Sequence, residues 1–191
     1  MRFSVLASGS TGNALYLETD EVRLLVDAGV SGRQLEQLLA AYHVAPGQLD
    51  AIVISHEHID HIKGIGVLSR RYRLPVYANP ATWQAMPSQV GEIPEELRRF
   101  FDTGKTFRIG DLEIESFSTS HDAADPVGFC FYHGTAKLGL ATDLGYMSRK
   151  VMDKVRDAQV LILEANHDVE MLRMSRYPWD VKRRILSDVG H

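Results

Sequence analysis

The sequence predicts an α/β or α+β domain in which helices cover β-sheets, and three observations lead to this fold class. Short β-rich runs separated by turn residues fill the first quarter of the 191 residues. Farther along, strands alternate with segments whose apolar residues recur at the helical period. The run Asp50 to Ser55 is too apolar for a half-exposed strand, which suits a sheet that is covered on both faces.

The first three strands are expected to form a small antiparallel meander. They lie at residues 3–7, 14–18 and 22–26, and turn-forming residues separate them. A helix then begins near Ser31, because Ser31 and Gln34 have the spacing of a capping box. The apolar residues at helical spacing in this segment are Leu35, Leu38, Leu39 and Tyr42.

The remaining elements follow from the same two periods. They are expected, in chain order, as strand 50–55, a helix along Ile62, Ile65, Leu68 and Tyr72, strand 76–78, helix 80–86, strands 107–109 and 112–118, strands 127–133 and 137–142, helix 148–156, strand 160–163 and a helical tract over 180–188. Residues 87–105, which are rich in proline and charge, are interpreted as a surface excursion without an assigned structure.

Length and composition bound the class of protein. With 45% hydrophobic and 24% charged residues, the chain fits one globular domain over residues 1–191. A net charge of -4 argues against a surface coated in basic residues, so any nucleic-acid contact would be local. The only cysteine, Cys130, lies in an apolar segment and provides neither a disulfide nor a thiolate cluster. No apolar run approaches the roughly 20 residues of a membrane span, so we expect a cytoplasmic protein without membrane contact.

A dense cluster of titratable residues follows the apolar run. The stretch Ser55-His-Glu-His-Ile-Asp-His61 holds three of the eight histidines. Imidazole nitrogens and carboxylate oxygens are ligands of zinc and related divalent ions. His56 and His58, two apart in extended backbone, project to one side and can hold one ion together. Asp60 and His61 would point to a second position, so the motif predicts two adjacent metal ions.

Seven residues cannot fill two coordination shells, so further ligands are expected downstream. The candidates are His121, Asp143 and His191. Each lies just past the end of a strand or helix, where loops hold functional groups on a rigid frame. Asp143 is well suited to bridge two ions, because each of its carboxylate oxygens can bind one of them.

These residues, in this order, resemble the metallo-β-lactamase superfamily of binuclear metallohydrolases. The resemblance rests on His-x-His-x-Asp-His at 56–61, on His121, Asp143 and His191, and on Asp27 in Leu25-Val-Asp-Ala-Gly29; it spans nearly the whole chain. Four shorter strings resemble its WalJ (YycJ) branch, bacterial cytoplasmic enzymes described as five-prime to three-prime DNA exonucleases. The strings are Leu6-Ala-Ser-Gly-Ser-Thr-Gly-Asn13, Ala141-Thr-Asp-Leu-Gly145, Glu164-Ala-Asn-His-Asp168 and Asp188-Val-Gly-His191.

The resemblance implies a fold, an activity and a ligand set. The fold is an αββα sandwich, and the activity is hydrolysis of DNA phosphodiesters with a hydroxide that bridges two ions. The implied cofactors are two divalent metal ions, zinc or manganese, with iron also compatible with mixed nitrogen and oxygen ligands. The resemblance assigns His56, His58 and His121 to the first ion, Asp60, His61 and His191 to the second, Asp143 to the bridge, and Asp27 to a hydrogen bond that orients a ligand histidine.

The end of the sequence departs from the family pattern. The family continues past its last metal histidine with another strand and helix, whereas this sequence stops at His191. We therefore expect a fragment that lacks these two elements. If the molecule in solution ends at His191, the second metal is weak or absent, because a ligand at a terminus is poorly held.

Some candidate residues have two interpretations. His167 is either an ordinary loop residue or a proton donor to the leaving group, in which case it joins Asp60 among the catalytic candidates. Ser10 and Asn13 lie in a glycine-rich loop that either binds a phosphate through backbone N–H groups or forms a plain hairpin turn. The arginines and lysine between residues 70 and 108 are either solvated surface charges or contacts to a phosphate backbone.

Three functions stay open at the level of sequence. A nuclease, acting on nucleic acid and by resemblance on DNA, is favoured by the branch strings. A thioester or lactam hydrolase on the same fold is the alternative, although lactam hydrolases of the superfamily often use a cysteine at the second metal and are exported. A structural or redox metal protein ranks last, because structural zinc sites favour sulfur ligands. The metal, the polarity and the oligomeric state are left open.

Overall fold

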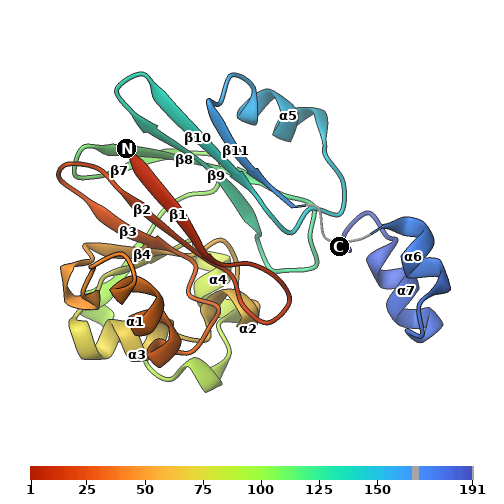
Figure 1. Cartoon of the computed structure of the whole chain (residues 1–191), viewed down its shortest axis with the longest axis horizontal. Helices are drawn as coiled ribbons and strands as arrows, with labels where there is room; N and C mark the ends of the chain where they lie inside the picture. Colours follow the sequence, from red (N-terminus) through yellow and green to blue (C-terminus); the bar gives the residue numbers. More distant parts are fainter. Residues whose placement is uncertain (165–167, 191) are drawn as a thin grey trace.

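The computed structural model describes residues 1–164 and 168–190, and within them two β-sheets pack face to face (Figure 1). The first sheet contains, in spatial order, β1 (Arg2–Ala7), β2 (Ala14–Glu18), β3 (Arg23–Val26), β4 (Ala51–Val53), β5 (Val76–Ala78) and β6 (Arg98–Phe100). The second contains β11 (Val160–Leu163), β10 (Ala136–Ala141), β9 (Val127–His133), β8 (Leu112–Ser118) and β7 (Thr106–Ile109).

Strand direction changes within each sheet. The predicted meander is confirmed, because β1, β2 and β3 pair antiparallel, whereas β3, β4, β5 and β6 pair parallel. In the second sheet β7 to β10 are antiparallel and β11 runs parallel to β10. The carboxyl ends of the four parallel strands therefore lie at one edge of the first sheet, where ligand sites of such sheets form.

Helices cover the outer faces of the two sheets. Figure 1 shows α1 and α3 against the first sheet and α5 against the second, which confirms the predicted αββα arrangement. The helices are α1 (Gly32–Ala40), α2 (Ile59–Ile62), α3 (Ile65–Tyr72), α4 (Pro80–Ala85), α5 (Arg149–Val155), α6 (Val169–Met174) and α7 (Trp179–Ile185). In the described part of the chain, none of them has the length and apolar character needed to cross a membrane.

Each face of the first sheet contributes to a separate hydrophobic core. In β4, Ile52 packs with residues of α1 and α3, whereas Ala51 and Val53 pack between the two sheets. All three residues are buried, so the prediction of a strand covered on both faces is confirmed. The next residues along the chain are the metal motif, which is thus anchored to a strand packed on both sides.

The strand before the metal motif and the helix after it differ from their predicted form. The strand predicted over residues 50–55 is shorter, Ala51–Val53, and the helix predicted along residues 62–72 is divided into α2 and α3. The division follows from Gly64, since a Cβ there would lie 2.6 Å from the carbonyl oxygen of Val30. The chain bends at Gly64 so that α3 can pack on the first sheet while α2 stays beside the metal motif.

Strand β6 and helix α6 were not predicted. Two arginines make β6 unlike an apolar strand, and its extended conformation depends on parallel pairing with β5, in which Ala78 is the partner of Phe100. Helix α6 has only six residues, too few to show a periodic pattern. The predicted tract over 180–188 is found as α7, which begins at Trp179 and ends at Ile185.

The segment with α6 and α7 lies to one side of the sandwich in Figure 1, and polar contacts attach it to loops of the second sheet. Arg184 Nε donates to Asp122 Oδ2 at 2.8 Å, and Ser120 Oγ donates to the carbonyl oxygen of Asp188 at 2.5 Å. Gly145 is required at this junction, because a Cβ there would lie 2.0 Å from the same carbonyl oxygen.

We expect Ile52→Ala to lower the free energy of unfolding by about 2–5 kcal/mol. The side chain of Ile52 is fully buried, so its truncation opens a cavity in the core. The control is Ile59→Ala, since Ile59 is 41% exposed and its truncation should cost under about 1 kcal/mol. Urea unfolding followed by far-UV circular dichroism measures both values. Equal losses would show that β4 is not packed on both faces as described.

Candidate metal centre

The metal motif lies where loops from both sheets meet. Asp27 follows β3, His56 follows β4, His121 follows β8, and Asp143 follows β10. Backbone hydrogen bonds join these loops: Asp27 N–H donates to Val53 O at 2.9 Å, and Ala28 N–H donates to His61 O at 2.7 Å. Residues separated by more than a hundred positions are therefore held together by rigid strand ends rather than by flexible segments.

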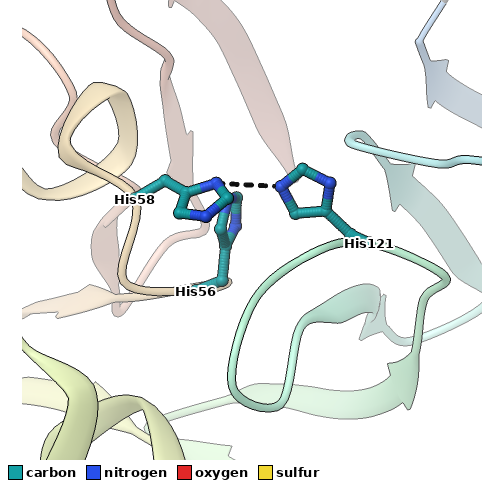
Figure 2. A group of neighbouring side chains, drawn as sticks. All are labelled: His56, His58 and His121. Carbon is teal, nitrogen blue, oxygen red and sulfur yellow. Dashed lines mark hydrogen bonds between the residues drawn. The ribbon is translucent and has the colours of Figure 1, made fainter. Parts of the chain in front are cut away.

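The first group of ligand atoms consists of three imidazoles. His56, His58 and His121 each present one ring nitrogen, and these atoms lie within 4.8 Å of one another. Figure 2 shows His56 and His58 on one loop facing His121 on another, with His58 Nδ1 and His121 Nε2 2.9 Å apart. Three convergent nitrogens form one side of a tetrahedral site and leave a position open.

One nitrogen of this group, Nε2 of His56, indicates that the partner of this site is a ligand from outside the chain. His56 is 2% exposed, and its Nε2 is buried without a hydrogen-bond partner among the described residues. Buried polar atoms in folded proteins are almost always paired, because the lost hydration is otherwise not compensated. A cation bound by Nε2 compensates for it, so this donor set fits a divalent metal ion.

A second group shares one histidine with the first. His56, His61 and Asp143 also present ligand atoms within 4.8 Å of one another, and His61 Nε2 lies 3.1 Å from Asp143 Oδ2. Asp60, the other residue assigned to the second ion, has its Oδ2 3.8 Å from the same His61 nitrogen and belongs to neither group among the described residues. The structure thus places the predicted ligands of two sites side by side, with His56 common to both.

A buried carboxylate orients the imidazole of His61. Asp27 is 3% exposed, and the Nδ1–H of His61 donates to its Oδ2 at 2.8 Å. This hydrogen bond directs Nε2 of His61 toward Asp143. Carboxylates behind a histidine commonly fix the orientation of a metal ligand in this way.

Ser55 links the two groups and was not singled out from the sequence. Its backbone N–H donates to Asp27 Oδ1 at 2.8 Å, and its hydroxyl donates to Asp27 Oδ2 at 2.7 Å. The same hydroxyl oxygen lies 3.0 Å from Nδ1 of His56 and 3.3 Å from Nδ1 of His61. Ser55 therefore holds Nδ1 of His56 on its inner side, which leaves Nε2 to face the ion. The only signal in the sequence is a short polar residue between a buried strand and the motif.

The electrostatic environment shifts the pKa values of the two buried histidines in opposite directions. Burial, together with the neighbouring His61, lowers the pKa of His56 well below its usual value. Burial also acts to lower the pKa of His61, but the carboxylates of Asp27 and Asp143 outweigh it and raise the pKa to about 10. In the protein without an ion, a proton on His61 thus compensates the carboxylates, and a metal ion that binds there must displace that proton.

Backbone strain is found at both carboxylates beside His61. Asp27 and Asp143 adopt left-handed conformations, with φ of 57° and 54°. Such a conformation costs a non-glycine residue free energy, although aspartate tolerates it better than most residues. The hydrogen bonds of the two carboxylates offset this cost, and the left-handed turn aims each side chain back toward the motif.

The glycine-rich loop contacts the site through one of its two predicted residues. The side-chain nitrogen of Asn13 lies 3.0 Å from His61 Nε2, while its Oδ1 accepts from Gly9 N–H at 3.0 Å. The backbone of Asn13 donates to Asp60 O at 2.7 Å, which fixes the loop against the motif. Ser10 is exposed in the same loop. His167 and His191, the remaining predicted site residues, lie outside the described residues.

Glu57 is a further residue that sequence reasoning missed. Its Oε1 accepts from the backbone N–H of Ala124 at 2.7 Å and so holds the loop that contains His121. The arginines between residues 70 and 108, by contrast, are bound to groups of the chain itself. Arg71 pairs with Glu36 at 2.9 Å and Arg108 with Glu113 at 2.6 Å. These pairs are typical of solvated surface charges.

Known proteins resemble this chain over its whole length. Residues 22–191 match the family model of the β-lactamase superfamily domain. The chain is 53% identical over 191 residues to exodeoxyribonuclease YycJ of Bacillus anthracis and 48% identical over 192 residues to exodeoxyribonuclease WalJ of Streptococcus pneumoniae. Both alignments cover 100% of this chain, which spans 72% and 71% of these two relatives.

Solved structures at lower identity share the fold. The zinc-bound PqqB of Methylobacterium extorquens has a TM-score of 0.72 and 17% identity, over 85% of this chain and 64% of that protein. The metallo-β-lactamase fold protein YhfI of Bacillus subtilis has a TM-score of 0.70 and 21% identity, over 86% and 71%. At these identities the likeness concerns the fold alone.

We expect Ser55→Ala to weaken metal binding by about 10- to 100-fold, because partners that orient ligand histidines contribute roughly this much. Titration of metal-depleted protein with zinc in competition with a chromophoric chelator measures the affinity. Ser69→Ala is the matched control, since Ser69 is also buried and donates to Leu74 O at 2.8 Å, away from the motif. It should lower stability and leave the affinity unchanged; an unchanged affinity in Ser55→Ala would contradict the role given to Ser55.

Proposed function

This chain belongs to the metallo-β-lactamase superfamily, and we propose that it is a metal-dependent exodeoxyribonuclease that hydrolyses DNA in the five-prime to three-prime direction. The observation that supports this proposal most is its identity of 53% and 48%, over the full chain, to two exodeoxyribonucleases. The histidine and aspartate groups add the ligand atoms that hydrolysis by a metal enzyme requires.

In this proposal the two groups of ligand atoms hold two divalent ions. His56, His58 and His121 would hold the first; His61, Asp60 and His191 would hold the second, and Asp143 would contribute to both. A pair of divalent ions supplies an activated water nucleophile and stabilises the attacking and leaving oxygens of a phosphodiester. The nitrogen and oxygen donors suit zinc, manganese or iron.

The chain itself contributes orientation and hydrogen bonds. Asp27 and Ser55 fix the rings of His56 and His61, so the ligands need little rearrangement before an ion binds. The amide nitrogen of Asn13, 3.0 Å from His61 Nε2, places N–H donors where a phosphate oxygen approaches the ions. His167 is proposed as the proton donor to the leaving oxygen, and Ser10 as a further contact to the phosphate.

We expect the metal-reconstituted protein to release nucleotides from end-labelled DNA, and His58→Ala to lower kcat/KM by more than about 100-fold. The reason is that loss of a ligand should cost more than the 10- to 100-fold typical of an outer hydrogen bond. His43→Asn is the matched control, because His43 is exposed and belongs to neither group of ligand atoms. Intact DNA together with rapid turnover of a thioester would contradict the nuclease and favour the alternative hydrolase.

Removal of metal should abolish activity and also lower the thermal midpoint of unfolding. An ion that binds only the folded protein stabilises it by about 2.7 kcal/mol when its concentration is 100 times the dissociation constant. Differential scanning fluorimetry with and without a chelator, followed by addition of zinc or manganese, measures the shift and its recovery. A midpoint and an activity that are both insensitive to the chelator would argue against a resident metal.

A further inference from the structure

A cavity of about 300 Å³ lies on the outer face of the first sheet, apart from the metal ligands. It is lined by α4, by the segment 86–93 and by the edge strand β6. Two aromatic rings, those of Trp83 and Phe100, contribute to its wall together with the guanidinium of Arg98. Its volume is at the lower end of the range for sites that bind small organic groups.

The aromatic wall is held in position by polar contacts. Trp83 Nε1 donates to Arg99 O at 3.0 Å, and the indole packs against the core of the first sheet. Arg98 lies over the indole, with its Cζ 5.7 Å from the ring centroid, and donates from Nε to Ile93 O at 2.9 Å. The terminal guanidinium nitrogens of Arg98 have no hydrogen-bond partner among the described residues, so they can bind a ligand.

Phe100 differs from its neighbours in having no core to pack against. It is 61% exposed, and its ring centroid lies 6.1 Å from that of Trp83 at an angle of 49°. The next residue, Phe101, is 4% exposed and belongs to the core between the sheets. An exposed phenylalanine beside a fixed indole presents an aromatic face on which a planar ring can stack.

The register of the parallel strands places this wall at the carboxyl end of the first sheet, which is also where the metal ligands lie. Val53 of β4 is the partner of Tyr77 of β5, and Ala78 is the partner of Phe100 at the end of β6. Because neighbouring strands are about 4.8 Å apart, the end of β6 lies about 10 Å across the sheet from the end of β4. Asn79, which caps α4, also donates to Asp125 O at 2.7 Å and so ties the cavity wall to the loop of His121.

The charge of the cavity indicates which part of a nucleic acid fits it. Arg98 and Glu92 carry opposite charges, and Ser88 adds a hydroxyl, so the lining includes polar groups but has no excess of basic ones. A phosphate group would be repelled by Glu92 and attracted by Arg98. A heterocyclic base has a flat apolar face for stacking and donors and acceptors at its edge, which matches both features.

We propose that this cavity binds one nucleobase of the DNA strand whose end lies at the metal centre, by stacking on Phe100 and Trp83. The proposal rests on the nuclease function proposed above and adds to it a contact beyond the scissile bond. Stacking on an aromatic side chain tolerates any base, so this contact favours single-stranded DNA without selecting a sequence.

The test combines a protein variant with a substrate variant. Wild-type protein, Phe100→Ala and Phe3→Ala are reconstituted with metal and assayed on single-stranded oligonucleotides in which one abasic position is moved stepwise from the cleaved end. Phe3 is the matched control, because it is 40% exposed on β1 at the opposite edge of the same sheet. Far-UV circular dichroism confirms that each variant is folded.

For the wild type we expect one abasic position, a short distance from the cleaved end, to raise KM by about 5- to 100-fold, the range of a single base–aromatic stack. Phe100→Ala should raise KM on the ordinary oligonucleotide by a similar factor, with kcat little changed, and should lose its sensitivity to that abasic position. Phe100→Trp should restore both properties, and Phe3→Ala should behave as the wild type.

The remaining outcomes distinguish this proposal from the function on which it rests. If the wild type degrades DNA but Phe100→Ala is indistinguishable from Phe3→Ala, the nucleobase site is wrong and the nuclease function stands. A loss in Phe100→Ala that is equal on ordinary and abasic oligonucleotides at every position also overturns stacking. Wild-type protein that leaves DNA intact overturns both proposals.

Discussion

The site depends on one buried interaction, the hydrogen bonds of the Asp27 carboxylate with Ser55 and His61. A carboxylate taken out of water is costly unless it is paired, and here its contacts with the Ser55 hydroxyl and with His61 also orient the rings of His56 and His61. His61 and Ser55 together compensate the buried carboxylate of Asp27, and Asp27 in turn orients the ring of His61. Loss of one partner leaves the other as an uncompensated buried polar group, which costs more than the interaction contributes.

Rigid strands around this network determine which atoms can meet. The motif leaves β4, which is packed on both faces, and the other ligands leave β8 and β10 of the opposite sheet. Hydrogen bonds between loop backbones leave these segments little freedom to move independently. The entropic cost of bringing the donors together is therefore met when the sandwich folds. An ion that binds finds ligands that are already close to their final positions.

The surface around the site is less basic than nucleic-acid binding alone would suggest. Several arginines between residues 70 and 108 pair with acidic residues or with carbonyl oxygens, and the net charge is -4. If the chain binds DNA as proposed, these paired arginines have less charge available for counterion release along the phosphate backbone. In the proposed nuclease, a DNA strand would be held by ions at the centre, by hydrogen bonds from the glycine-rich loop and by the aromatic wall at the carboxyl end of the first sheet.

The sequence alone was sufficient for the class of fold, most strands and helices, and the kind of metal chemistry, because the hydrophobic period and the spacing of His56, His58 and His61 are local properties. It did not reveal β6, the division of the helix at Gly64, the position of Ser55 between two imidazoles, or His56 as the ligand common to both groups. These depend on contacts between segments far apart in the chain. Pairing partners, close backbone approaches and shared ligands exist only after the two sheets pack, so only the tertiary structure could decide them.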